Sequence, residues 1–143
     1  LHRLISGYEF GRSIAYERTR HLDQLSAVLR EGRLADGREV DSRRYPDLIR
    51  EAASLRSSLA EAFEGVDILM SPSAAGPAPA SLESTGDAAF SAAWSLAGNP
   101  VITLPLFQAA DTAMPIGCQL IAGFGEDEKL LNVSQAIMTR FQA

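Results

Sequence analysis

Apolar residues recur every three or four positions in three parts of the chain, and this period predicts three amphipathic helices. The first spans residues 8–32, and the polar stretch "LADGREVD" after it predicts a turn. The second begins near Pro46 and continues to Gly65. The third follows the acidic residues 126–128, which suit a helix N-terminus, and its predicted packing face is Leu130, Ser134, Ile137 and Phe141.

The period changes after residue 65, where three short apolar runs predict buried strands at residues 66–72, 101–106 and 116–123. We expect 101–106 to pair with 116–122 and 66–70 to join the same sheet. The proline- and glycine-rich segment between the first two runs predicts a long loop. It leads into a short helix, "DAAFSAAWSLAG", in which Phe90 and Trp94 share a face and are expected to face a cleft at the strand ends.

This order of elements predicts an α/β fold with a partial mixed sheet of about three strands flanked by helices. Strands that are apolar on both faces belong inside a covered sheet and need neighbours on both edges. We therefore expect the sheet to be part of a larger one. An exposed edge left in this chain would favour self-association into a homo-oligomer.

Charge and composition exclude several classes of function. Residues 1–65 hold eleven arginines and eleven acidic residues, so the net charge of −5 arises in the rest of the chain. Nucleic-acid binding is not expected, because it needs an uncompensated basic surface. No apolar run is long enough to span a membrane. The single cysteine, Cys118, lies in an apolar run and predicts a core residue, which fits a cytoplasmic location.

The chain offers few groups for catalysis. It lacks the Gly-x-Ser-x-Gly motif, and its histidines, His2 and His21, lie in charged or terminal segments. Ser71 and Ser73 flank Pro72 at a strand end, where their hydroxyls can simply satisfy the loop backbone. One cysteine and two distant histidines provide no metal site, and no phosphate-binding loop occurs. No cofactor and no metal are therefore expected.

Three segments resemble, in order, the closing part of amidase signature enzymes: "FEGVDILMSPSAAGPAP", "TGDAAFSAAWSLAGNPVITLPL" and "MPIGCQLIAGFGEDEKLL". The resemblance covers the C-terminal two-thirds of the chain and extends loosely to the leading helices. It implies that residues 1–143 are the C-terminal portion of a single amidase signature domain whose N-terminal catalytic portion is absent. The start at Leu1, without a methionine, agrees with this expectation.

The resemblance also implies a chemistry, namely hydrolysis of carboxamide C–N bonds by a serine, a bridging serine in a cis peptide and a lysine. The "Gly-Gly-Ser-Ser-Gly-Gly" type signature is absent here, and the only lysine, Lys129, lies in the tail. No catalytic residue is therefore assigned to this chain, which is expected to be inactive alone. The resemblance places a set of residues near the pocket for a small-molecule amide: Pro72, Thr85, Asp87, Phe90 and Trp94.

Two alternatives remain open. The first is an A-type component of a tRNA-dependent amidotransferase, which belongs to the same family. Trp94, where many relatives carry asparagine, and the lack of a basic surface count against it. The second is a non-catalytic interaction module derived from an amidase. A glycine- and serine-rich signature upstream of this segment would favour an enzyme over the module.

Overall fold

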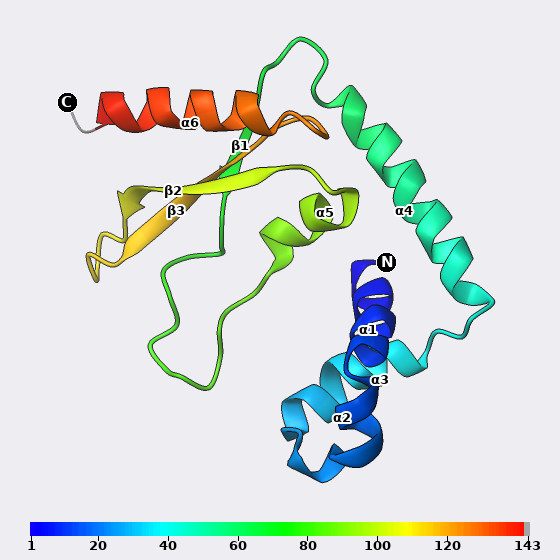
Figure 1. The fold of residues 1–143 in the computed structure, drawn as a ribbon. Helices are drawn as coiled ribbons and strands as arrows, with labels where there is room; N and C mark the ends of the chain where they lie inside the picture. Colours follow the sequence, from blue (N-terminus) through cyan, green and yellow to red (C-terminus); the bar gives the residue numbers. More distant parts are fainter. Residues whose placement is uncertain (142–143) are drawn as a thin grey trace. The chain divides into compact units, whose positions relative to one another are not determined.

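The computed structural model describes residues 1–141 (Figure 1). These residues form two compact units, of which the first is Leu1–Leu55 and the second begins at Arg56. The boundary between them along the chain falls within a helix. Among these residues, no helix is both long enough and apolar enough to cross a membrane. The expectation of a single amidase signature domain over residues 1–143 stays a prediction.

The first unit is helical, but its helices differ from the predicted ones. It contains α1 (His2–Ser13), α2 (Ala15–Arg20), a 3₁₀ turn (Leu22–Gln24), a π-helical turn (Leu29–Arg33) and α3 (Leu34–Arg38). The prediction of one helix over 8–32 is wrong, because the backbone leaves the helical region at Ile14 and again at His21. The predicted polar turn is wrong as well. The first five residues of this segment, "LADGREVD", form α3, because the burial of Leu34 and Val40 outweighs the local preference for a turn.

The backbones of α1 and α3 touch at a pair of glycines. A Cβ atom added to Gly37 would lie 2.3 Å from the carbonyl oxygen of Gly7, and one added to Gly7 would lie 2.7 Å from the amide nitrogen of Gly37. Arg33 adds a hydrogen bond of 2.7 Å to Ser6 Oγ, and its guanidinium lies 4.5 Å from the centre of the Phe10 ring. The close approach of these two helices therefore determines the fold of the unit.

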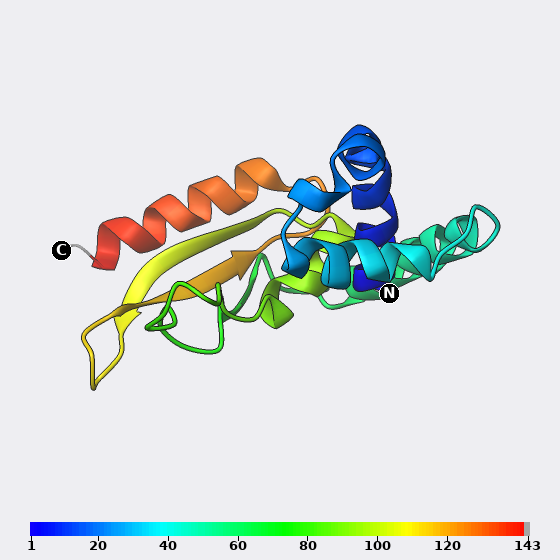
Figure 2. The same cartoon turned by 90° about the horizontal axis from the view of Figure 1, so that it is seen from below.

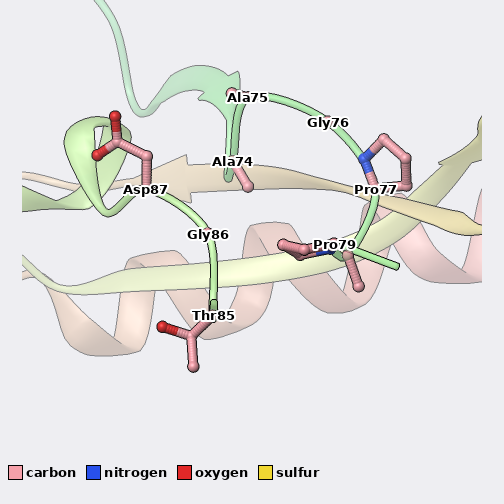
Figure 3. Close-up of a pocket in the computed structure, with 9 residues that line it drawn as sticks. Ala74, Ala75, Gly76, Pro77, Pro79, Thr85, Gly86 and Asp87 are labelled. Atoms are coloured by element: carbon pink, nitrogen blue, oxygen red, sulfur yellow. The ribbon is translucent and has the colours of Figure 1, made fainter. Parts of the chain in front are cut away.

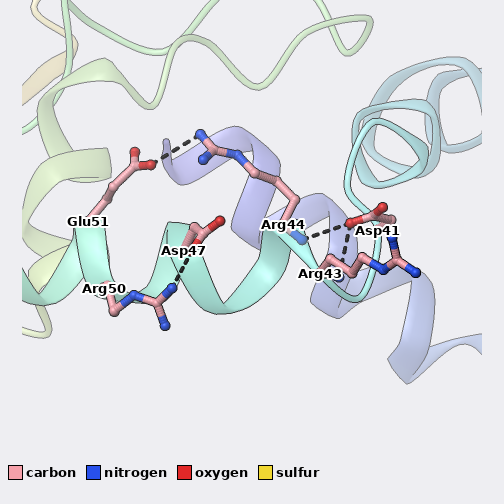
Figure 4. Close-up of polar contacts among 6 residues, drawn as sticks. All are labelled: Asp41, Arg43, Arg44, Asp47, Arg50 and Glu51. Carbon is pink, nitrogen blue, oxygen red and sulfur yellow. Dashed lines mark hydrogen bonds and ion pairs between the residues drawn. The ribbon is translucent and has the colours of Figure 1, made fainter.

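Helix α4 (Arg44–Glu61) begins with a side-chain cap (Figure 4). Asp41 Oδ1 accepts hydrogen bonds from the backbone N–H groups of Arg43 (3.0 Å) and Arg44 (2.7 Å), which satisfies two free donors at the helix start. Two ion pairs, Arg44–Glu51 and Arg50–Asp47, lie along its exposed side. The predicted helix from Pro46 is confirmed, with its start two residues earlier and its end at Glu61 rather than at Gly65.

A tyrosine pair joins the start of α4 to α1. The rings of Tyr8 and Tyr45 stack with their centres 4.5 Å apart, and the Tyr45 hydroxyl donates a hydrogen bond of 2.6 Å to Glu9 Oε1. This bond to a carboxylate raises the pKa of Tyr45, and partial burial and the negative charge of Glu9 raise it further.

Stability of the first unit is expected to fall at alkaline pH for this reason. Because the folded state raises the pKa of Tyr45, its contribution is fully present below the unfolded value of about 10 and is lost as the pH rises through the folded value. Urea unfolding followed by circular dichroism between about pH 8 and 12 measures the effect. The difference in unfolding free energy between the wild type and Tyr45→Phe should shrink across that range. A constant difference would contradict this assignment.

The second unit contains a three-stranded sheet. Its strands are β1 (Leu69–Pro72), β2 (Val101–Gln108) and β3 (Pro115–Ile121), in the order β1-β3-β2. The α/β class and the expected pairing are confirmed: 101–106 pairs with 116–122, and 66–70 joins the sheet through Leu69 and Met70. Within the described residues the sheet is antiparallel throughout rather than mixed. A short connection folds β2 directly back on β3, and β1 also runs antiparallel to β3.

The two faces of this sheet carry different helices, α6 (Asp127–Phe141) on one and α5 (Ala89–Ala97) on the other (Figure 2). The α6 side holds a buried core made of Leu104, Cys118, Leu120, Ala122 and Leu130. Cys118 is thus a core residue, as predicted. On α6, Leu130, Ser134 and Ile137 pack inward as expected, but Phe141 is 59% exposed and Met138 packs against the core instead.

Strand β2 carries an irregularity near its middle. The pairing with β3 shifts between Leu104 and Phe107, a β-bulge that includes Pro105. Proline has no N–H group to donate, so it is tolerated where a strand has a free edge or a bulge. In the part of the chain that the structure describes, both β1 and β2 have a free edge.

Candidate functional site

Helix α5 carries two of the predicted pocket residues, and local sequence determines where it begins and ends. Asp87 Oδ1 accepts a hydrogen bond of 2.9 Å from the backbone N–H of Ala89, at the helix start. Gly98 ends the helix in the left-handed conformation, at φ +74°, which favours glycine. The helix predicted within residues 87–98 is therefore confirmed.

A buried glutamine joins the first turn of α5 to the sheet. Gln119 lies on the central strand β3 and is 1% exposed. Its Nε2 atom donates to Ser71 Oγ on β1, at 2.8 Å, and to the backbone carbonyl of Phe90 on α5, at 2.7 Å. Three elements therefore meet at one side chain. Sequence reasoning missed Gln119, although a lone polar residue within "GCQLIAG" was a signal that it is hydrogen-bonded inside the fold.

The last turn of α5 is held by a second side chain. Arg56 Nε donates to the carbonyl of Ala97 at 2.5 Å, and its guanidinium lies 4.4 Å from the centre of the Phe124 ring. Just beyond the helix, Asn99 Nδ2 donates to the carbonyl of Ala122 at 2.9 Å. The start of α5 is thus attached to β3 through Gln119, and the residue that follows its end, Asn99, is attached to Ala122, directly after β3.

Two hollows lie on the unit near the loop before α5. One, of about 360 Å³, is formed by the loop itself and is lined by Ala74, Ala75, Gly76, Pro77, Ala78, Pro79, Thr85, Gly86 and Asp87 (Figure 3). The other, of about 260 Å³, is more apolar and is lined by Met70, Ser71, Pro72, Phe107, Ile116, Gly117 and Cys118.

The predicted pocket residues are distributed over these features. Thr85 and Asp87 share the loop hollow, and Pro72 lines the apolar one. Phe90 and Trp94 line neither of them. Phe90 is 37% exposed and Trp94 is half-buried, so neither is sealed in the core. That these two rings face a substrate cleft stays a prediction.

The two serines at the end of β1 have structural partners. Ser71 Oγ accepts the bond from Gln119 and lies 3.3 Å from the carbonyl of Pro72. The backbone N–H of Ser73 donates to the carbonyl of Gly117 at 3.1 Å, which extends the pairing of β1 with β3. Neither contact supplies a base to either hydroxyl.

Lys129 is engaged in ion pairs. Its Nζ atom lies 2.7 Å from Glu126 Oε1 and 4.0 Å from Asp67 Oδ1. The hydrogen bond to Glu126 raises the pKa of Lys129 and lowers that of Glu126, so the amine is held in its charged form. A lysine that accepts a proton from a serine must be neutral.

Other proton carriers are equally poorly placed. His21 Nδ1 lies 3.4 Å from Gln24 Nε2, and its ring is tilted against Tyr16 on an exposed segment. Within residues 1–141, no group of three or more His, Cys, Asp or Glu side chains is arranged to hold a metal ion. The contacts described above therefore hold α5 against the sheet, and the loop hollow and the apolar hollow lie nearby.

Comparison with known proteins agrees with this architecture. The family model described as Amidase matches residues 14–131. The chain belongs to the amidase family. The match extends across both compact units and includes the three strands and α5, so the resemblance in the sequence is confirmed.

Individual amidase-family relatives are much longer than this chain. It is 33% identical over 103 residues to AmiC of Mycobacterium leprae, which carries an amidase assignment, covering 64% of this chain and 22% of that protein. It is 36% identical over 84 residues to the A-type component of the glutamyl-tRNA(Gln) amidotransferase of Bdellovibrio bacteriovorus. This match covers 54% of this chain and 17% of that protein. A crystal structure of an amidase superposes with a TM-score of 0.86 at 28% identity, over 96% of this chain and 34% of that one. The chain thus spans about a fifth of these relatives and a third of that structure.

Proposed function

We propose that this chain is the C-terminal part of an amidase that hydrolyses carboxamide C–N bonds, with a Ser–cis-Ser–Lys triad located outside residues 1–143. One observation carries the proposal: almost the whole chain superposes on an amidase structure while covering only a third of it. The lack of a neutral lysine and of the glycine- and serine-rich signature supports it.

In this proposal the chain contributes the substrate side of the site. The loop after β1 and the first turn of α5 form part of the wall around a small-molecule amide, through Pro72, Thr85, Asp87, Phe90 and Trp94. The nucleophile, the proton carrier and the donors that stabilise the oxyanion come from the rest of the polypeptide. The reaction needs no metal or cofactor, and the protein acts in the cytoplasm.

The test compares the 143-residue chain with a longer polypeptide that includes the upstream signature. Amidase assays with aliphatic and aromatic carboxamides should show turnover by the longer protein and none by residues 1–143. The reason is that uncatalysed amide hydrolysis is too slow to detect without a positioned nucleophile and proton carrier. Turnover by the chain alone, abolished by Ser71→Ala or Ser73→Ala, would overturn the proposal.

An A-type amidotransferase component is the second candidate, supported by the 36% identity to the Bdellovibrio protein. A longer polypeptide of this kind would hydrolyse glutamine in preference to other carboxamides and would need partner proteins for transfer. Preference for non-glutamine amides argues for the amidase instead. Inactivity on both would favour the third alternative, a non-catalytic interaction module.

A further inference from the structure

Gln119 occupies a position where most strands carry an apolar residue. Its neighbours Cys118 and Leu120 point into the core beneath α6, so Gln119 projects from the opposite face of β3. An amide in a buried position is costly unless it is hydrogen-bonded. Both hydrogens of its Nε2 group are used, one toward Ser71 Oγ and one toward the Phe90 carbonyl.

The two hydrogen bonds of Gln119 connect it to different elements, β1 and α5. Ser71 already pairs with Gln119 in the backbone register of β1 and β3, so the bond to its hydroxyl adds to a contact that the sheet makes anyway. Phe90 lies instead in the first turn of α5, directly after an exposed loop. The Asp87 carboxylate bonds only to the N–H group of Ala89, two residues ahead of it, so this bond does not attach the start of the helix to the sheet. The bond from Gln119 spans that distance.

We propose that Gln119 is a positioning residue for the substrate pocket, acting through the Phe90 carbonyl. It holds the first turn of α5 against β3, and with it the Phe90 ring and the adjoining Asp87, at the pocket wall. Arg56 holds the far end of the helix at Ala97, so loss of the Gln119 bond releases only the pocket end. The role in selectivity rests on the proposed amidase function, whereas the placement of α5 does not.

The placement is tested in the 143-residue chain through Trp94, its single tryptophan, which lies one turn from Phe90 on α5. Gln119→Met preserves the side-chain length and removes both bonds. Ser71→Ala is the matched control, because it removes the bond between Gln119 and β1 and leaves the bond to the Phe90 carbonyl in place. Acrylamide quenching of Trp94 should rise about two- to fivefold in Gln119→Met and stay at the wild-type level in Ser71→Ala, as expected when one hydrogen bond limits local opening.

Equal quenching in the wild type and Gln119→Met would overturn the proposal, whatever the activity. If circular dichroism shows Gln119→Met to be unfolded, Gln119→Asn replaces it, since that side chain keeps the amide but is too short to reach Phe90. The same rise in Gln119→Asn supports the proposal, and wild-type quenching in that variant overturns it.

The role in selectivity is tested in the longer polypeptide. Gln119→Met should raise KM for carboxamides with bulky acyl groups about three- to tenfold while kcat changes less than twofold, and propionamide should be hydrolysed as by the wild type. An equal loss on both substrates would mean a merely structural role and would overturn the proposal. Absence of any amidase activity in the wild-type longer protein would refute the proposed function instead, and the quenching result would stand by itself.

Discussion

Replacement of Gly37 by alanine is expected to unfold the first unit, Leu1–Leu55. The added Cβ atom would lie 2.3 Å and 2.5 Å from the carbonyl oxygen and carbon of Gly7, and 2.9 Å from the amide nitrogen of Tyr8. These are backbone atoms of α1, so no side-chain rotation relieves the overlap and the two helices must separate. Overpacking of this kind costs about 1–3 kcal/mol and sometimes more, and contact with backbone favours the upper end.

The matched control for Gly37 is Gly32, in the π-helical turn that precedes α3. A Cβ atom there meets nothing within 4 Å, so Gly32→Ala should be neutral or stabilise by up to about 1 kcal/mol. Urea unfolding of the 143-residue chain, followed by far-ultraviolet circular dichroism, measures both variants. Equal midpoints for Gly37→Ala and Gly32→Ala would show that α1 and α3 do not depend on this contact.

Leu120→Ala should cause the largest loss of stability in the second unit. Leu120 is 0% exposed on the central strand and belongs to the core that packs beneath α6. Truncation of a buried leucine removes apolar contacts and leaves a cavity, which together cost about 2–5 kcal/mol.

Leu131 on α6 provides the comparison for Leu120, because it is 59% exposed. Leu131→Ala should change the unfolding free energy by less than about 0.5 kcal/mol. Chemical denaturation of both variants, monitored by the fluorescence of Trp94, gives the two values. If Leu131→Ala costs as much as Leu120→Ala, a partner must cover that side of α6, in another part of the protein or in a second copy.

The sequence predicts the second unit well because its signals are local. The change from helical period to short apolar runs locates all three strands, and Gly98 and Pro100 separate α5 from β2. The first unit is predicted poorly because its structure depends on a contact between positions 7 and 37, which no local pattern reveals. The helix breaks at Ile14 and His21 carry neither proline nor glycine, so nothing in the sequence marks them.

The candidate site shows the same division. The loop and the two ends of α5 follow from Asp87, Gly98 and the prolines, which act within a few residues. Which side chains meet around a hollow depends on the path of that loop, and a segment without periodicity does not specify its path. Gln119 was overlooked for a related reason: one of its partners lies 29 residues away along the chain.

The prolines of the two outer strands affect how copies of this protein can associate. Pro72 ends the four-residue β1, and Pro105 with its bulge interrupts β2, so neither free edge presents a long unbroken row of donors and acceptors. Dry stacking of identical strands into fibrils needs uninterrupted segments of about six or seven residues without proline. Any β-pairing between copies is therefore expected to stop at small oligomers, and concentrated solutions should not develop the roughly 4.7 Å cross-β repeat.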